Sequence, residues 1–139
     1  MHRRDHGERI RVYSGAPWED AVAYCRATRV GPWILVAGTT AVDARGAPVA
    51  PGDMAAQTAF VLETIGRALA ACGGSLADVV RTRAFVTDIG RFGAFAAAHR
   101  AAFRGIDPVA TCVEVQRLVA PELVVEIEVD AYVGEPNAT

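Results

Sequence analysis

The sequence predicts an α+β fold, with one mixed sheet, two helices on a single face of it, and the element order β-β-α-β-α-β-β. Residues 123–133 alternate apolar and polar side chains, which is the period of a strand with one buried face. Residues 53–74 repeat apolar side chains at three- and four-residue steps, which is the period of a helix. About half of the 139 residues are apolar, enough for the core of one domain.

The first two predicted strands form a hairpin. Residues 24–30 mix polar and apolar side chains, the Gly-Pro pair at 31–32 makes a turn, and residues 33–39 form the second strand. The preceding residues, 1–20, are polar and interrupted by Gly and Pro, so we expect a partly flexible N-terminal segment. The folded domain is predicted over 21–139.

The first predicted helix has clear end signals. Asp53 can cap its start, because the carboxylate can accept hydrogen bonds from the free amides of the first turn. Leu62, Ile65 and Leu69 then fall on one face, and the glycine pair at 73–74 is typical of a helix end.

The second half of the chain supplies the rest of the sheet. Residues 78–88 are good strand formers, and residues 90–103 are predicted to form a second helix with His99 on its phenylalanine side. Two strands follow, at 111–117 and 123–133.

The last two strands are predicted to be two-faced. In the last one, Val125 and its apolar neighbours point toward the helices, and Glu126 and Glu128 point away. In the strand before it, Val113 is predicted on the apolar face and Cys112 on the opposite one. Two helices cover only one face of such a sheet, so the second face meets either water or other copies of the chain, and its aromatic and Arg content favours a ring of subunits.

Composition excludes several classes of function. The net charge of −2 argues against an electrostatic footprint for nucleic acid. All basic residues are Arg, so a Schiff-base lysine is impossible and ordinary pyridoxal-phosphate enzymes are excluded. The three cysteines form no CxxC motif and the three histidines no ligand pair, so we expect neither metal nor cofactor. Without an apolar leader or a membrane-length apolar run, a cytoplasmic protein that does not bind membranes is expected.

Four segments together resemble the blocks of the RidA (YjgF-type) reactive-intermediate deaminase family. They follow the family's order from about Tyr24 to Val133, and although no single block is specific, four in order make a strong signal. The segments are Tyr24 with Val36–Thr39, Ala56–Thr58 with Leu62 and Ile65, Ala77–Asp88, and Pro108–Val115 with Val125–Glu128.

The resemblance implies a chorismate-mutase-like fold and a homotrimer with small-molecule clefts between adjacent subunits. In deaminating members, an Arg two residues after the block's Pro clamps the carboxylate of an enamine or imine, water attacks the imine carbon, and ammonia leaves. Here the block begins at Pro108 and that position is Ala110. A guanidinium matches a carboxylate in two hydrogen bonds, and losing one partner of a desolvated charge pair costs about 2–5 kcal/mol.

The resemblance also implies roles for individual positions. Tyr24 matches the tyrosine that lines the cleft, and Gly38 sits in the strand-end turn that shapes it. Glu126 matches the carboxylate that positions or activates water, with Glu128 as the alternative. Ala37 stands where the family often has Ser.

Ala110, Thr111 and Cys112 complete the predicted substrate contacts, with Cys112 matching the family's cysteine. The residues alone allow other interpretations: Tyr24 as a packing aromatic, Cys112 as a small buried side chain, the two glutamates as ion-pair partners, and His99 as a core or interface histidine. The arginines that could replace the missing clamp are Arg26, Arg81, Arg83 and Arg117.

These observations favour a RidA-family homotrimer that hydrolyses reactive enamine or imine metabolites. The alternative is a non-catalytic metabolite-binding protein of the same fold. Endoribonuclease or translation-inhibitor activity is the third hypothesis, and it is disfavoured because the sequence indicates neither a basic stripe nor a pair of histidines.

Overall fold

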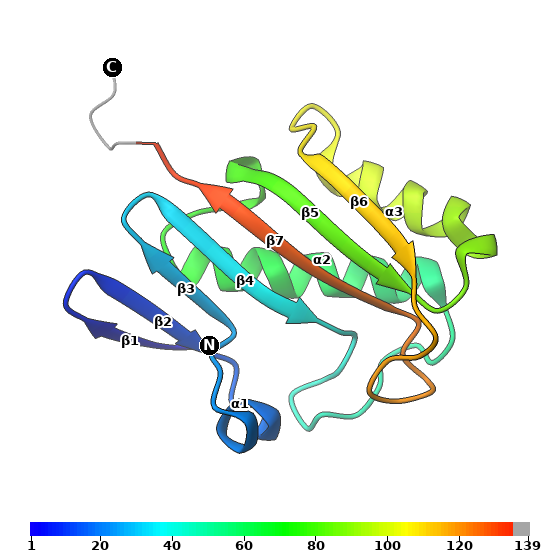
Figure 1. Ribbon diagram of the computed structural model, residues 1–139, viewed down its shortest axis with the longest axis horizontal. Coiled ribbons are helices and arrows are strands. Elements are labelled where there is room, and N and C mark those ends of the chain that lie inside the picture. The colour runs from blue at the N-terminus through cyan, green and yellow to red at the C-terminus, as the bar shows by residue number, and fades with distance from the viewer. Residues whose placement is uncertain (135–139) are drawn as a thin grey trace.

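A seven-stranded mixed sheet carries the fold, in the strand order β1-β2-β3-β4-β7-β5-β6 (Figure 1). The computed structural model describes residues 1–134. All neighbouring strands are antiparallel except β5 and β6, which are parallel. The strands are β1 (His2–His6), β2 (Arg9–Tyr13), β3 (Ala27–Val30), β4 (Trp33–Thr39), β5 (Val79–Val86), β6 (Val109–Glu114) and β7 (Val125–Tyr132). The helices are α1 (Pro17–Val22), α2 (Met54–Ala71) and α3 (Phe92–Phe103), with 3₁₀ turns at Leu76–Asp78 and Ile89–Arg91.

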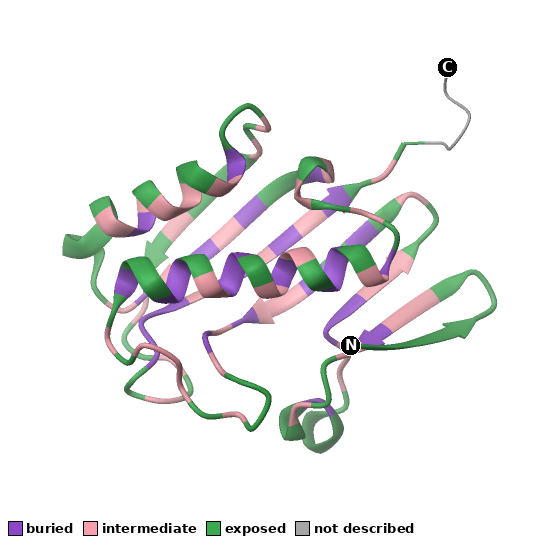
Figure 2. Cartoon of the chain, turned by 180° about the vertical axis from the view of Figure 1, so that it is seen from behind, coloured by how far each residue is buried: buried purple, intermediate pink, exposed green. Residues whose placement is uncertain are grey.

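The predicted α+β fold class is confirmed. The seven predicted elements are β3, β4, α2, β5, α3, β6 and β7, and they occur in the predicted order. Figure 2 shows α2 and α3 side by side on one face of the sheet, with the buried residues of the strands beneath them. The other face of the sheet, the open face, has no helix over it within residues 1–134.

The structure adds a β-hairpin and a short helix within residues 1–22, ahead of the predicted elements. Strand β1 is exposed along its whole length and pairs only with β2. Its register sets His2 opposite Tyr13, Arg4 opposite Arg11, and His6 opposite Arg9, so these six side chains share one face. The sequence indicates no basic stripe, but the hairpin forms a short one, because strand alternation and pairing bring three arginines to the same side.

Helix α2 forms as predicted and provides most of the covering layer. The Asp53 carboxylate accepts a hydrogen bond from the Ala56 amide at 3.0 Å, which caps the first turn. Val61, Leu62, Ile65 and Leu69 are fully buried or nearly so, and they pack against the sheet.

A buried glutamine on α2 sets the path of the chain into β7. The Gln57 side-chain amide donates to the carbonyls of Val49, Ala50 and Glu122, and its oxygen accepts from the Val124 amide at 2.9 Å. Buried polar groups are retained when their partners are all supplied, as they are here. The hydrogen bond from Val124, which lies two residues before Glu126, fixes where β7 starts.

The predicted buried and exposed faces are confirmed for β7 and are wrong for β6. Along β7 the exposed fraction alternates as predicted, with Val125, Ile127 and Val129 buried. In β6, however, Cys112 lies beside buried Ala84 and packs against the core, whereas Val113 is 43% exposed on the open face. The predicted faces of β6 are therefore wrong. As an edge strand that is mostly exposed, β6 has no strong apolar alternation to indicate its orientation.

Among residues 1–134, no helix is both long and apolar enough to cross a membrane.

Candidate functional site

A cavity of about 620 Å³ opens between α1, α2 and the end of β4. One wall carries the polar residues Tyr24, Arg26, Gly38, Thr39 and Glu126. The opposite wall comes from α2, with Phe60, Thr64 and Arg67. The mouth is flanked by the apolar side chains of Trp18, Val22 and Val119.

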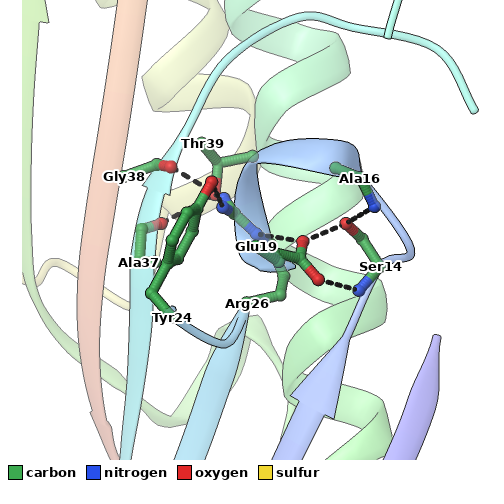
Figure 3. A network of polar contacts seen from close by, with 8 residues as sticks. All are labelled: Ser14, Ala16, Glu19, Tyr24, Arg26, Ala37, Gly38 and Thr39. Carbon is green, nitrogen blue, oxygen red and sulfur yellow. Dashed lines mark hydrogen bonds and ion pairs between the residues drawn. The ribbon is translucent and has the colours of Figure 1, made fainter. Parts of the chain in front are cut away.

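The polar wall is organised by a buried ion pair. Arg26 and Glu19 are only 7% and 4% exposed, and Arg26 Nε lies 3.7 Å from the Glu19 carboxylate. Figure 3 shows Arg26 extending from the start of β3 toward the strand end of β4, with Glu19 of α1 beside it. A buried charge persists only when it is paired and hydrogen-bonded, so this pair fixes α1 against the sheet.

Both partners of the ion pair have further contacts. Arg26 Nη1 donates to the Gly38 carbonyl at 2.7 Å and to Thr39 Oγ1 at 2.9 Å, and Nη2 donates to the Tyr24 hydroxyl at 3.3 Å. The guanidinium also lies over the Tyr24 ring, 5.5 Å from its centroid. Glu19 accepts from both the amide and the hydroxyl of Ser14. The network therefore holds Tyr24 and the β4 strand end in fixed positions.

Glu126 lies against Gly38, where the pairing of β4 and β7 is irregular. The register shifts between Val36 and Thr39, so β4 bends at this point. A Cβ on Gly38 would lie 2.8 Å from Glu126 Oε2, which is closer than such atoms approach in proteins. The glycine thus makes room for the Glu126 carboxylate.

Two carboxylates line this cavity and their pKa values are shifted in opposite directions: hydrogen bonds from the Ala47 and Arg45 amides lower the pKa of Asp43, whereas the pKa of Glu126 is raised. Burial raises the pKa of the Glu126 carboxyl above its usual value; Arg26 opposes the rise and Glu128 adds to it. The hydrogen bonds formed within residues 1–134 include none to the Glu126 carboxylate. A carboxylate of this kind, facing a cavity beside a tyrosine and an arginine, can take a proton from a bound water and return it.

Glu128 and two candidate arginines lie elsewhere. Arg83 is 3.4 Å from Asp130 and 4.0 Å from Glu128, and Arg81 is 3.8 Å from Asp130, all on the open face of the sheet. These partly exposed ion pairs are not part of the cavity wall. Of the two predicted catalytic glutamates, only Glu126 reaches the cavity.

The remaining predicted contacts are divided between β4, in the middle of the sheet, and β6, at its edge. Ala37 lines a second cavity, of about 820 Å³, which shares Tyr24 with the first. Ala110, Thr111 and Cys112 lie on β6, separated from β4 by β7 and β5. A single copy of the chain therefore does not bring the β6 residues to the Glu126 cavity. Arg117 is exposed in the segment after β6.

His99 lies outside the cavity, between two phenylalanines of α3. Its ring centroid is 5.5 Å from that of Phe95 and 4.7 Å from that of Phe103, and Nε2 is 3.0 Å from Thr82 Oγ1. Burial lowers the pKa of His99 below its usual value of 6.5. This location fits a structural histidine, which is the interpretation that the sequence favours.

The buried neutral form of His99 predicts that acid destabilises the protein. The unfolded chain binds a proton at His99 more readily than the folded one, so the free energy of unfolding decreases as the pH falls below about 6.5. His99→Leu should lose this part of the pH dependence. Urea unfolding of both proteins between pH 7.5 and 5.5 measures it, and parallel losses in wild type and variant would contradict the assignment.

The sequence pattern does not predict two residues of the site, Glu19 and Trp18. Glu19 and Trp18 lie in a helix of six residues, too short to show a 3.6-residue period. A local signal was nevertheless present, because Pro17 begins the helix and Glu19 and Asp20 are acidic residues in its first turn.

Within the described part of the chain, no group of three or more His, Cys, Asp or Glu side chains could hold a metal ion.

A family model described as Endoribonuclease L-PSP matches residues 16–133. The chain belongs to this family. It is also known as the YjgF/RidA family, and the fold matches those of its solved members. Rv2704 of Mycobacterium tuberculosis, a member of the YjgF/YER057c/UK114 family, is 50% identical, with a TM-score of 0.82 over 90% of this chain and 99% of that one.

Two further relatives are less similar in sequence. The uncharacterized protein SCO2049 of Streptomyces coelicolor is 35% identical over 89% of this chain and 92% of its own length. The structure of E. coli TdcF with bound serine is 25% identical, with a TM-score of 0.73 over 80% of this chain and 88% of that one.

Proposed function

We propose that this YjgF/RidA protein hydrolyses a small imine or enamine in the Glu126 cavity. The observation that carries the proposal is the Glu126 carboxylate itself: its pKa is raised by burial, it is free of hydrogen bonds within residues 1–134, and it faces a cavity of about 620 Å³ beside Arg26 and Tyr24. A carboxylate with these properties suits the role of a general base that takes up and releases a proton.

In the proposed reaction, Glu126 accepts a proton from a bound water as the water oxygen attacks the imine carbon. A C–O bond forms, Glu126 passes the proton to the nitrogen, and the product is a carbinolamine. Glu126 then moves the proton of the new hydroxyl group to the nitrogen, the C–N bond breaks as the C=O bond forms, and ammonia leaves a carbonyl compound. The Tyr24 hydroxyl, held by Arg26, is placed to orient the ligand. The relative TdcF was solved with bound serine, which supports a small molecule as the kind of ligand for this fold.

The proposed assembly is a homotrimer in which β6 of one subunit completes the cavity of the next. The open face of the sheet supports subunit contact, since Trp33, Leu35, Val113 and Tyr132 are each more than two-fifths exposed there. Sedimentation equilibrium should give three times the 14.7 kDa subunit mass. Trp33→Glu should shift the protein toward monomer, and a monomeric wild type would contradict the assembly.

The test of the reaction couples the protein to an oxidase that releases an imine. Ammonia is measured with and without the protein, under conditions where the oxidase is not rate-limiting. The proposal expects ammonia release to accelerate in proportion to the protein added. A rate equal to that in buffer, for both amine-derived and amino-acid-derived imines, would refute it.

A non-catalytic binding protein is the second candidate, and Ala110 favours it. At that position, an Arg of deaminating relatives would bind the substrate carboxylate. In this alternative the cavity holds a metabolite without turning it over. Calorimetric binding of a small ligand, together with no acceleration of imine hydrolysis, would support it over the enzyme.

Ribonuclease activity, despite the name of the family, remains the least favoured function. The hairpin's basic face does carry His2 and His6, but they lie four residues apart on one strand, about 13 Å at the usual rise. Two histidines at that separation cannot both act on one phosphate.

Gly38→Ala should impair the reaction while leaving the fold intact. The new Cβ would displace the flexible end of Glu126, and a misplacement of about 1 Å can cost roughly 100-fold in rate. Gly93→Ala is the matched control, because a Cβ there meets nothing within 4 Å. Steady-state rates and thermal melts of both variants measure the effect, and equal rates would contradict the role of the Gly38–Glu126 contact.

A further inference from the structure

We infer that the ligand of the Glu126 cavity carries no carboxylate and is an uncharged imine with an apolar substituent. The inference rests on the proposed function and names its substrate class. Four features of the cavity carry it: Arg26, the buried arginine that faces the cavity, is already neutralised, the other cationic groups on the wall are exposed, exposed apolar side chains line the cavity, and the proposed base is itself an anion.

Arg26 is not available as a clamp. Its Nη1 has two acceptors, Nη2 donates to Tyr24, and its charge is balanced by Glu19 inside the protein. Binding a ligand carboxylate in a planar fork requires two adjacent N–H groups of one guanidinium. To provide them, Arg26 would have to release contacts that hold α1 and β4 in place. Arg26 therefore shapes the cavity rather than holding an anion.

Arg67 is the other arginine on the wall, and it is exposed, as is Met1 at the N-terminus. Arg67 extends from the C-terminal half of α2 and donates to Thr64 Oγ1 at 3.3 Å. An ion pair with an exposed arginine strengthens binding by no more than about fivefold, because water solvates both charges. That is far below what a desolvated clamp provides.

Exposed apolar side chains line part of the cavity. Trp18, Val22 and Val119 are 49%, 66% and 65% exposed, and all three line the cavity. Exposed apolar side chains that line a cavity are typical of ligand-binding sites. An apolar substituent placed against the Trp18 ring would remove this surface from water.

A carboxylate on the ligand would also lie near Glu126. Two carboxylates in one partly buried site disfavour each other's charged form, so such a ligand would weaken the ionised state that the base needs. A neutral imine does not have this cost. The reaction is then R–CH=NH + H₂O → R–CHO + NH₃, in which water supplies the oxygen of the aldehyde and two hydrogens of the ammonia.

Two oxidase reactions give a matched pair of substrates. An amine oxidase acting on phenethylamine gives a neutral imine, and an amino-acid oxidase acting on phenylalanine gives the same skeleton with a carboxylate. We expect kcat/KM to be at least about 30-fold higher for the neutral imine, which corresponds to the lower end of the cost of an unpaired desolvated charge. Equal rates, or faster hydrolysis of the carboxylated imine, would overturn the inference. A carboxylate preference that Arg67→Met abolishes would overturn it and assign the clamp to Arg67.

Variants at the mouth test the apolar contact separately. Trp18→Ala should lower kcat/KM for the neutral imine by about 10- to 100-fold, the worth of burying a large apolar side chain. Ile89→Ala removes a similarly exposed apolar side chain outside the cavity and should leave the rate unchanged. Equal rates for the two variants would contradict the placement of the substituent at Trp18.

Binding without turnover separates this inference from the proposed function. Phenylacetamide and phenylacetate differ in charge but not in size, and calorimetry measures both on the unmodified protein. Tighter binding of the amide supports the inference even if neither imine is hydrolysed, in which case only the proposed reaction fails. Tighter binding of phenylacetate, or no binding of either compound, would overturn the inference.

Discussion

Replacing Arg26 by methionine is expected to destabilise the protein by about 3–5 kcal/mol. The change leaves the Glu19 carboxylate buried without its cation, since Glu19 is only 4% exposed. It also removes the donors to the Gly38 carbonyl and Thr39. Urea unfolding measures the loss of free energy, and the thermal midpoint should fall by about 10 °C or more.

Two further variants show whether the buried charge is the cause. Arg81→Met breaks a partly exposed ion pair with Asp130 and should cost about 0–1 kcal/mol. The double variant Glu19→Gln with Arg26→Met removes the unpaired charge and should be more stable than the sum of the single losses. If Arg26→Met costs no more than Arg81→Met, the network does not organise the site.

Replacing Glu126 by glutamine is expected to reduce imine hydrolysis by about 100- to 10,000-fold, the usual contribution of a positioned general base. Glutamine keeps the size of the side chain but cannot accept the proton from water. Because burial disfavours the charged carboxylate of Glu126, the variant should be as stable as wild type or more stable. Rates per folded protein, measured with the neutral imine, give the effect.

Glu128→Gln is the matched control. It is the same substitution on the same face of β7, two residues away, and it affects the contact with Arg83 instead of the cavity. We expect its rate to remain close to that of wild type. Equal losses in the two variants, or a loss only in Glu128→Gln, would show that the base has been assigned to the wrong glutamate.

The central elements of the fold could be predicted because their sequence patterns agree with their environment. The alternation along β7 corresponds to a strand whose one side is buried under α2, and the Asp53 cap and the apolar repeat identify α2 itself. In both elements, local preference and tertiary packing favour the same structure. Resemblance to the family then identified Tyr24, Gly38 and Glu126, which the fold brings to one cavity.

The features that could not be predicted depend on partners far away in the sequence. The β1–β2 hairpin is exposed and polar, so no apolar pattern marks its strands. Glu19 gains its role only because the start of β3 brings Arg26 next to α1. The faces of β6 follow from its parallel pairing with β5, which a short exposed edge strand does not encode.

The pH dependence of kcat/KM tests the role of Glu126 most directly. With the spontaneous rate at each pH subtracted, we expect wild-type activity to be lost in acid through a group whose pKa lies above the usual value for glutamate, because burial raises the pKa of Glu126. The residual activity of Glu126→Gln should lack this decrease. An acid limb that persists unchanged in Glu126→Gln would contradict the assignment of this carboxylate as the base.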